Sequence, residues 1–317
     1  MKDEIEEIME KVYYDKLYDS WVKNFALNLE NISKEPSSRI LSSGNVNQKK
    51  PVIVIGKGPS LKEKNHLEKL AKSNFDGKIV CCDGSLITTL KAGVTPEKFP
   101  EFFVVSIEGR LGETTKYYDD DIVKKYGSKI KGLFSTVTDS EAVECARKNG
   151  IKIHWFHALF DYEEGKKSFN HISALMVRAK NHPKGLPGIQ TGGNVGTTSW
   201  FVSWQILKSP TIVLIGMNHG WSEKDPIELI TSHGHYYPVP DIDQNSALFN
   251  KLFPKIYNPE FDCYCILDPV FQYYSNGFKE FISRSPQWVN TINATEGGVI
   301  FGDRIKCMVF TDFLKNQ

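Results

Sequence analysis

The first 34 residues carry apolar side chains mostly at three- and four-residue intervals, the spacing of one helical face. These apolar positions include Ile5, Ile8, Val12, Leu17 and Trp21. The periodicity predicts a helix over residues 1–34. Residues 35–50 are polar and rich in turn-forming residues, which predicts a linker.

Farther along the chain, short apolar runs alternate with amphipathic stretches. Runs rich in β-branched and aromatic residues predict strands at 51–55, 78–82, 102–107, 133–136, 152–156 and 211–215. The stretches between them predict helices at 61–72, 85–92, 140–149 and 196–207. This alternation is typical of an α/β protein with a Rossmann-like, mainly parallel sheet and helices on both faces. Ligands bind such sheets at the carboxyl ends of the strands, near a switch in strand order.

The last third of the chain is less regular. Residues 217–260 show few periodic runs, which predicts a long binding loop. Residues 261–283 predict one or two helices, and residues 288–295 and 298–301 predict short strands. We therefore expect three parts. They are an N-terminal helical segment with its linker at 1–45, a Rossmann-like ligand-binding domain at 46–245 and a C-terminal α/β extension at 246–317.

Composition narrows the functional classes. The formal net charge of the 317 residues is +1, which argues against a long binding track for nucleic acid. No apolar stretch reaches the length of a membrane-spanning helix, and the charged N-terminus lacks the apolar region of a signal peptide. The six cysteines form no C-x-x-C pair, a pattern typical of reduced thiols. We expect a cytoplasmic protein without a membrane span or a nucleic-acid partner.

The strongest local motif follows the predicted strand at 51–55. The chain reads Gly-Lys-Gly-Pro-Ser over residues 56–60 and then enters a predicted helix. Glycines after a strand let a phosphate approach the backbone, and a helix N-terminus offers free N–H groups. The spacing departs from the P-loop and, at Leu61, from the dinucleotide fingerprint. A plain strand–helix turn is the alternative. The binding interpretation assigns ligand contacts to Gly56, Gly58, Pro59 and Ser60.

A second turn of small residues precedes the predicted helix at 196–207. It reads Gln-Thr-Gly-Gly-Asn-Val-Gly-Thr-Thr over residues 190–198. Small side chains and hydroxyl groups before a helix suit an anion or a ribose, and an amide side chain both donates and accepts hydrogen bonds. Helix capping is the alternative and is compatible with binding. The residues assigned to binding here are Thr191, Gly192, Gly193, Asn194 and Thr197.

Two carboxylates lie at predicted strand ends. Asp83 follows the strand at 78–82, and Glu108 follows the strand at 102–107. A carboxylate in this place can contact a ribose hydroxyl, a metal ion or a base. Turn formation and helix capping are the structural alternatives for both residues.

Three histidines lie in the predicted loop: His219, His233 and His235. An imidazole titrates near neutral pH and can act as a general base toward an acceptor hydroxyl. The Ser-His-Gly-His-Tyr stretch also resembles a pair of metal ligands, although its spacing is loose and no third ligand is evident. General base, metal ligand and ordinary loop histidine all stay open from the residues alone.

The stretches 56–61, 103–108 and 192–200, followed by Leu-Ile-Gly at 214–216, resemble the core of the MptE-like family. That family includes archaeal 6-hydroxymethyl-7,8-dihydropterin diphosphokinases and motility accessory factors that modify flagellin. The Gly-x-Gly-Pro-Ser-Leu turn is also similar to that of bacterial CMP-sialic acid transferases. The resemblance covers residues 50–240 and implies a transferase that binds a nucleotide-activated donor.

Two branches of the family imply different donors. The diphosphokinases carry a D-x-D-like segment suited to Mg-ATP and an H-x-H-G-D element. In this chain the D-x-D-like segment is replaced by a single carboxylate, Glu108. The H-x-H-G-D element is matched only in part, by the His-Gly-His stretch at 233–235. The stretch 103–108 and the Asn-Ala-Thr-Glu-Gly-Gly sequence at 293–298 look instead like the motility-factor branch. That branch implies a CMP-sugar donor.

We therefore expect a glycosyltransferase that moves a sugar of nonulosonic-acid type from a CMP-sugar to a hydroxyl acceptor on a protein or glycan. The first rival is a pterin diphosphokinase, in which Asp83 and Glu108 would help to hold Mg-ATP and a pterin would be the acceptor. The second rival is a scaffold protein that binds a nucleotide without catalysis. We expect no resident cofactor or metal, and Mg²⁺ only with the diphosphokinase reaction.

Overall fold

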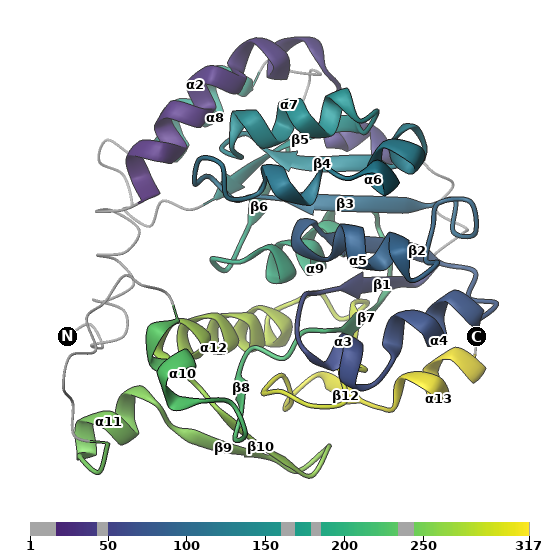
Figure 1. The fold of residues 1–317 in the computed structure, drawn as a ribbon. Coiled ribbons are helices and arrows are strands. Elements are labelled where there is room, and N and C mark those ends of the chain that lie inside the picture. The colour runs from purple at the N-terminus through teal and green to yellow at the C-terminus, as the bar shows by residue number, and fades with distance from the viewer. Residues whose placement is uncertain (1–16, 43–49, 160–168, 179–184, 234–243, 317) are drawn as a thin grey trace.

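The computed structural model describes residues 17–42, 50–159, 169–178, 185–233 and 244–316. A nine-stranded sheet in the order β12-β11-β7-β1-β2-β3-β4-β5-β6 runs through the molecule (Figure 1). Every pairing within it is parallel. Its strands are β1 Val52–Ile55, β2 Lys78–Cys82, β3 Phe102–Ser106, β4 Lys131–Ser135, β5 Lys152–Leu159, β6 Gly188–Gln190, β7 Thr211–Ile215, β11 Asn290–Asn293 and β12 Ile305–Cys307. The predicted α/β fold is confirmed.

Helices cover both faces of the sheet. Right-handed crossovers from β1 onward place α3 to α7 on one face, and the reverse crossovers from β6 to β7 and from β7 to β11 place α9 and α12 on the other. Trp200 of α9 and Phe278 of α12 pack edge to face at 5.7 Å between ring centroids. The helices are α3 Ser60–Glu63, α4 His66–Lys72, α5 Leu86–Lys91, α6 Asp121–Tyr126, α7 Ser140–Lys148, α8 Phe169–Val177, α9 Val195–Gln205, α12 Pro269–Ser283 and α13 Phe310–Lys315.

The strand order reverses between β1 and β7. From β1 the chain moves strand by strand to β6, then returns to place β7 on the other side of β1. In open α/β sheets the crevice at such a switch point is where ligands bind, outside the carboxyl ends of the strands. The topology therefore directs attention to the turns that follow β1 and β7.

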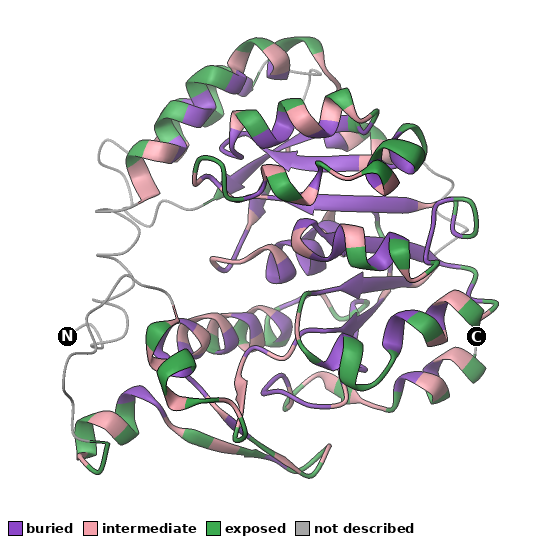
Figure 2. Ribbon diagram, in the orientation of Figure 1, coloured by how far each residue is buried: buried purple, intermediate pink, exposed green. Residues whose placement is uncertain are grey.

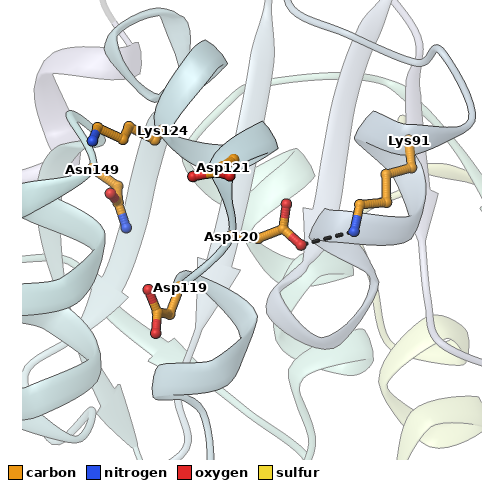
Figure 3. Close-up of a pocket in the computed structure, with 6 residues that line it drawn as sticks. All are labelled: Lys91, Asp119, Asp120, Asp121, Lys124 and Asn149. Carbon is orange, nitrogen blue, oxygen red and sulfur yellow. Dashed lines mark hydrogen bonds and ion pairs between the residues drawn. The ribbon is translucent and has the colours of Figure 1, made fainter.

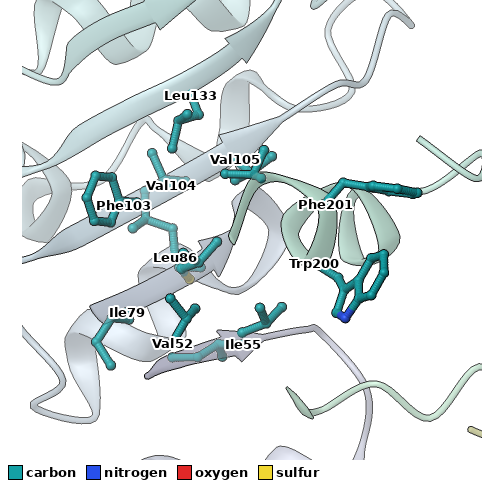
Figure 4. Close-up of a cluster of buried hydrophobic side chains, with 14 of the residues drawn as sticks. Val52, Ile55, Ile79, Leu86, Phe103, Val104, Val105, Leu133, Trp200 and Phe201 are labelled. Atoms are coloured by element: carbon teal, nitrogen blue, oxygen red, sulfur yellow. The ribbon is translucent and has the colours of Figure 1, made fainter. Parts of the chain in front are cut away.

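The core lies between the central strands and the helices that cover them. All four residues of β1 are fully buried, as expected for a parallel strand covered on both faces. Figure 2 shows buried strands and exposed residues on the outer sides of the helices. Trp200 and Phe201 of α9 lie against Val105 and Ile55 on one side of the sheet (Figure 4).

The N-terminal helix α2 spans Tyr18–Lys34, and the rest of the predicted helix lies outside the described residues. The prediction of a linker after it is wrong for residues 36–42. The Trp155 N–H donates to the Pro36 carbonyl, Ser37 forms a bridge with Trp155, and Ser38 is buried. Buried backbone groups need such partners, so this segment packs on β5.

The helix predicted at 61–72 is two helices. Asn65, between α3 and α4, has φ 51° in the left-handed region, which breaks the helical path. The first helix, α3, has only four residues. The partial positive charge at its N-terminus is accordingly smaller than the sequence pattern indicates.

Residues 217–260, predicted to form a long binding loop, contain regular secondary structure within the described residues, and their binding role stays a prediction. The segment contains β8 (Trp221–Ser222), α10 (Ile227–Ser232), α11 (Ala247–Leu252) and β9 (Lys255–Asn258). Strand β10 (Cys263–Ile266) pairs antiparallel with β8 and β9. These elements are too short for a periodic pattern to reveal them.

Beyond residue 260 the predicted elements are only partly correct. The predicted helical segment at 261–283 contains β10 before α12, and the strand predicted at 298–301 is replaced by β12 at Ile305–Cys307. Strands from both sides of residue 245 join the nine-stranded sheet. The division into three parts stays a prediction.

Candidate functional site

The turns after β1 and β7 contact each other closely. The Gly56 N–H donates to the Ile215 carbonyl at 2.9 Å, and the Gly58 N–H donates to the Gly216 carbonyl at 2.8 Å. A Cβ on Gly56 would lie 2.3 Å from the Gly216 oxygen, and one on Gly58 would lie 2.1 Å from Asn218 Oδ1. Both glycines are therefore required for the close approach of the two turns, and their own N–H groups are already bonded.

Two other groups of the first turn remain available. The N–H groups of Lys57 and Ser60 have no hydrogen-bond acceptor in the described part of the chain. Pro59, at the cap of α3, accepts hydrogen bonds from the first turn of that helix through its carbonyl. A ligand in this turn is thus better placed against exposed Lys57 than against the two glycines, whose N–H groups are already bonded.

Ser60 links the first turn to β7. Its hydroxyl donates to Asn218 Oδ1 at 2.8 Å, and its side chain is buried. The Asn218 carbonyl in turn accepts a hydrogen bond from the N–H of Val299. Sequence reasoning missed Asn218, because its contact with Ser60 spans 158 residues.

Lys57 is a second residue that sequence reasoning missed. Its ammonium group donates to the Tyr117 hydroxyl at 3.0 Å and lies 4.6 Å from the centre of that ring. Tyr117 ends a short 3₁₀ helix, η4 (Thr115–Tyr117), in the loop after β3. The lysine is exposed, so its charge is accessible to an anionic ligand. Its place inside the glycine turn is the signal that could have identified it.

Asp83 lies at the end of β2, where it was predicted. Its oxygens accept hydrogen bonds from the Ser106 hydroxyl and the Gly84 N–H, both at 2.7 Å. Burial raises the pKa of Asp83 to about 6, against the lowering effect of these two donors. Keeping a carboxylate charged at neutral pH is costly when it is this buried. Carboxylates with a raised pKa are common at functional sites.

Glu108 lies at the corresponding end of β3. Arg110 binds both of its oxygens, one through the backbone N–H at 2.9 Å and one through the guanidinium at 2.7 Å. Each of the four carboxylate oxygens of Asp83 and Glu108 therefore accepts one hydrogen bond, which fixes the orientation of both side chains.

The second glycine turn has the geometry of a capped helix. Asn194 Oδ1 accepts from the Thr197 N–H at 2.8 Å, and Thr191 Oγ1 accepts from the Gly193 N–H at 3.2 Å. Gly192 and Gly193 have φ 57° and 79°, which favours glycine at both positions. Capping is present, and the predicted contact of this turn with a ligand stays a prediction.

Because Asn194 caps α9, its variants are expected to change stability and nucleotide affinity separately. Asn194→Ala should lower the free energy of unfolding by about 0.5–2 kcal/mol, because the helix loses its cap. Asn194→Asp keeps a good cap, and its charge should repel an anionic donor. We expect Asn194→Asp to retain stability in chemical denaturation and to bind nucleotide more weakly in calorimetric titration. Equal affinity in Asn194→Asp and the wild type would remove this residue from the site.

His219 follows Asn218 and lies among aromatic rings. Its ring centroid is 5.7 Å from that of Phe278 and 6.3 Å from that of Phe271, both on α12. Burial lowers the pKa of His219 to about 4, and its Nδ1 has no partner in the described part of the chain. A histidine with this pKa is neutral at pH 7 but is a weak base.

His233 is the histidine best arranged for proton transfer. Its Nδ1 lies 2.5 Å from Oδ2 of Asp268, which is fully buried, whereas the histidine side chain is 32% exposed. The same oxygen accepts from Trp221 Nε1 at 2.7 Å, and the other caps α12 through the Phe271 N–H. Asp268 therefore fixes the orientation of the ring and directs Nε2 away from itself.

The His233–Asp268 dyad is connected to the glycine turns by contacts in series. The rings of His233 and His219 both pack on Phe271, and His219 directly follows Asn218. Sequence reasoning missed Asp268, which lies 35 residues from His233. The predicted His235 lies outside the described residues.

The stretch 293–298 has a structural role in this arrangement. The Thr295 hydroxyl accepts from the Met217 N–H, and the Asn293 amide donates to the Ile300 carbonyl. Glu296 accepts from the Phe310 N–H and contacts buried His66 at 3.2 Å. These contacts brace the end of β7 and the start of α13.

A surface hollow of ≈ 540 Å³ lies elsewhere (Figure 3). Its lining residues are Lys91, Asp119, Asp120, Asp121, Lys124 and Asn149. Lys91 ends α5, which leads to the start of β3, and Asn149 follows α7, which leads to the start of β5. The hollow therefore lies toward the amino-terminal ends of the strands, opposite the edge where α/β sheets bind ligands.

Two further observations concern the described residues only. No helix among them is both long and apolar enough to cross a membrane. No group of three or more His, Cys, Asp or Glu side chains among them could hold a metal ion.

Comparison with known proteins identifies a family and a solved structure of similar fold. The family model described as "6-hydroxymethylpterin diphosphokinase MptE-like" matches residues 23–224. No curated protein matches the chain. The solved structure of a MAf glycosyltransferase from Magnetospirillum magneticum AMB-1 is similar in fold, with a TM-score of 0.53 and 15% identity. The match covers 82% of this chain and 34% of that one, so the chain spans about a third of that protein's length.

Proposed function

The chain belongs to the MptE-like family, and from that premise we propose that it is a transferase that takes its group from a nucleotide-activated donor. The switch point between β1 and β7 supports this proposal, because it is the expected nucleotide site of an open α/β sheet. Accessible Lys57 lies in the turn at that point. The cytoplasmic location stays a prediction.

The transferred group in this proposal is a sugar from a CMP-linked donor, and the acceptor is a hydroxyl group. His233 Nε2 removes the acceptor proton, the acceptor oxygen bonds to the anomeric carbon, and the bond from that carbon to the phosphate oxygen breaks. CMP leaves with the bonding electron pair. Asp268 stabilises the imidazolium that forms, because its buried oxygen lies 2.5 Å from Nδ1.

The His233–Asp268 dyad carries this proposal. A histidine with one nitrogen held by a buried carboxylate and a partly exposed ring is suited to general-base catalysis. A glycosyl transfer needs such a base for its acceptor hydroxyl. The donor would lie against the turns at 56–60 and 191–197, with its phosphate near Lys57.

The second candidate is diphosphoryl transfer from Mg-ATP to a pterin, and the description of the matching family favours it. Mg²⁺ commonly neutralises the charge of the β- and γ-phosphates in such reactions. The two carboxylates predicted to hold it, Asp83 and Glu108, are engaged by Ser106, Gly84 and Arg110. These hydrogen bonds orient the carboxylates without excluding a metal ion, so the preference for the CMP-sugar proposal rests on the sequence, which has single carboxylates here in place of the D-x-D-like segment of the diphosphokinases.

A thermal-shift panel tests the two donors. The nucleotides are CMP, CDP, UDP, GDP and ATP, each with Mg²⁺ and with a chelator. A ligand at about 100 times its dissociation constant stabilises the folded state by about 2.7 kcal/mol. Each kcal/mol raises the melting temperature of a protein of this size by about 2–4 °C. We expect CMP or CDP to raise it and the shift to persist in chelator.

The other outcomes separate the rivals. A shift with Mg-ATP alone, increased by a hydroxymethyl-dihydropterin, would replace the sugar transfer by diphosphoryl transfer. A nucleotide shift without transfer to any hydroxyl acceptor, unchanged in His233→Ala, would identify a binding scaffold. No shift with any nucleotide would overturn the proposed donor class.

A further inference from the structure

Two buried asparagines on α2 reach the loops at the carboxyl ends of β3 and β4. Asn24 Nδ2 donates to the carbonyls of Gly109 at 2.7 Å and Val137 at 3.2 Å. Asn28 Nδ2 donates to the carbonyls of Thr138 at 2.7 Å and Thr136 at 3.3 Å. Each amide group therefore joins two backbone positions more than 80 residues away along the chain.

Packing alone does not account for these side chains. The exposed fractions of Asn24 and Asn28 are 0% and 1%, and Oδ1 of Asn24 has no donor in the described part of the chain. Leucine on the same helical face would bury apolar surface but would supply no donor to the four loop carbonyls, and a buried polar atom without a partner is destabilising. The asparagines therefore serve the two loops as well as the packing of the helix.

The loops that α2 holds are part of the candidate site. Gly109 directly follows Glu108, and a Cβ on Gly109 would lie 2.5 Å from Trp21 of α2. The Thr138 hydroxyl donates to the Ser106 carbonyl at 3.0 Å, and the Ser106 hydroxyl donates to Asp83. The positions of both predicted carboxylates, Asp83 and Glu108, are therefore linked to α2 through one or two contacts.

We infer that α2 is a positioning element of the donor site, with Asn24 and Asn28 as its positioning residues. This inference rests on the proposed function, since it takes the loops after β3 and β4 to line the donor. The helix holds four backbone carbonyls at fixed points, so the loops keep their shape when the site is empty. Preorganisation of this kind raises affinity, because the loops lose less conformational freedom on binding.

The chain offers a matched control at the other end of the same helix. Glu35, which caps α2, binds Arg147 through two hydrogen bonds of 2.7 and 3.0 Å and accepts from Trp155 Nε1 at 2.8 Å. These contacts attach the helix to α7 and β5 and touch neither loop. Glu35→Ala therefore loosens α2 while leaving both asparagine contacts in place.

The experiment compares Asn24→Ala, Asn28→Ala and Glu35→Ala in the full chain. Calorimetry gives the dissociation constant of CMP, or of whichever nucleotide binds the wild type. Hydrogen exchange measured by mass spectrometry follows residues 106–112 and 135–139. We expect both asparagine variants to raise the dissociation constant about tenfold, as for a lost hydrogen bond. We also expect faster exchange in both loops, and neither change in Glu35→Ala.

The outcomes are distinguishable from failure of the proposed function. If the wild type binds no nucleotide, the proposed function fails, and loop exchange alone decides whether α2 positions the loops. If an asparagine variant does not fold, the other variant carries the test. Unchanged exchange and affinity in the asparagine variants would overturn the inference. Equal losses in Glu35→Ala would overturn it too, because they would reflect general loosening of the helix.

Discussion

His233→Ala is expected to lower turnover by about 10²- to 10⁴-fold, the usual loss when a general base is removed. Donor affinity should stay within about threefold of the wild type, because a base for the acceptor hydroxyl contributes to the transition state more than to donor binding. The measurement is steady-state transfer from the donor identified by thermal shift, with calorimetry for the affinity. His171 is exposed on α8, and the control variant His171→Ala should keep full activity.

Asp268→Asn provides an independent check on the same dyad. Asparagine can still cap α12, but it carries no charge to stabilise the imidazolium and can favour the wrong ring tautomer. We expect a loss of turnover of the same order. If both variants retain turnover and His219→Gln loses it, the base is His219 and the dyad is structural.

The central strands could be predicted because burial on both faces leaves a strong pattern. Residues 79–82 and 211–215 form continuous β-branched and apolar runs, and the predicted strands at 78–82 and 211–215 have the same bounds as β2 and β7. The break in the helix at 61–72 could not be predicted in the same way, because it depends on the left-handed conformation of Asn65. Elements of two to six residues, such as β8 and α10, are shorter than the window that periodicity needs.

The residues of the candidate site also differ in whether the local sequence reveals them. The turns at 56–60 and 191–197 are local features that their glycines mark in the sequence. The structure requires those glycines because of positive φ angles or close backbone contacts. Asp268 and Asn218 act through tertiary contacts with His233 and Ser60. A contact between residues far apart in sequence leaves no periodic or local pattern, so the topology is needed to find it.

The buried carboxyl group of Asp83 provides the second large expected effect. Burial is the main reason that its pKa rises from 3.8 to about 6 in the folded protein. The folded state therefore holds this proton more tightly than the unfolded chain does. The resulting stabilisation is complete below about pH 4 and is lost as the pH rises through about 6. Above that pH, the buried charge costs about 3 kcal/mol, since one pKa unit corresponds to about 1.4 kcal/mol.

Asp83→Asn removes the charge and should raise the free energy of unfolding by about 2–3 kcal/mol at pH 7.5, with little change at pH 4. Chemical denaturation from pH 4 to 8 measures this difference, with the exposed Asp303→Asn as the control. If the charge is retained to bind a donor hydroxyl, the same variant should also bind nucleotide more weakly, by about 1.5–3 kcal/mol. Higher stability with lower affinity is the expected signature of a residue kept for function. A pH-independent difference, or a variant less stable than the wild type at pH 7.5, would mean that the carboxylate supports the fold through Ser106 and Gly84.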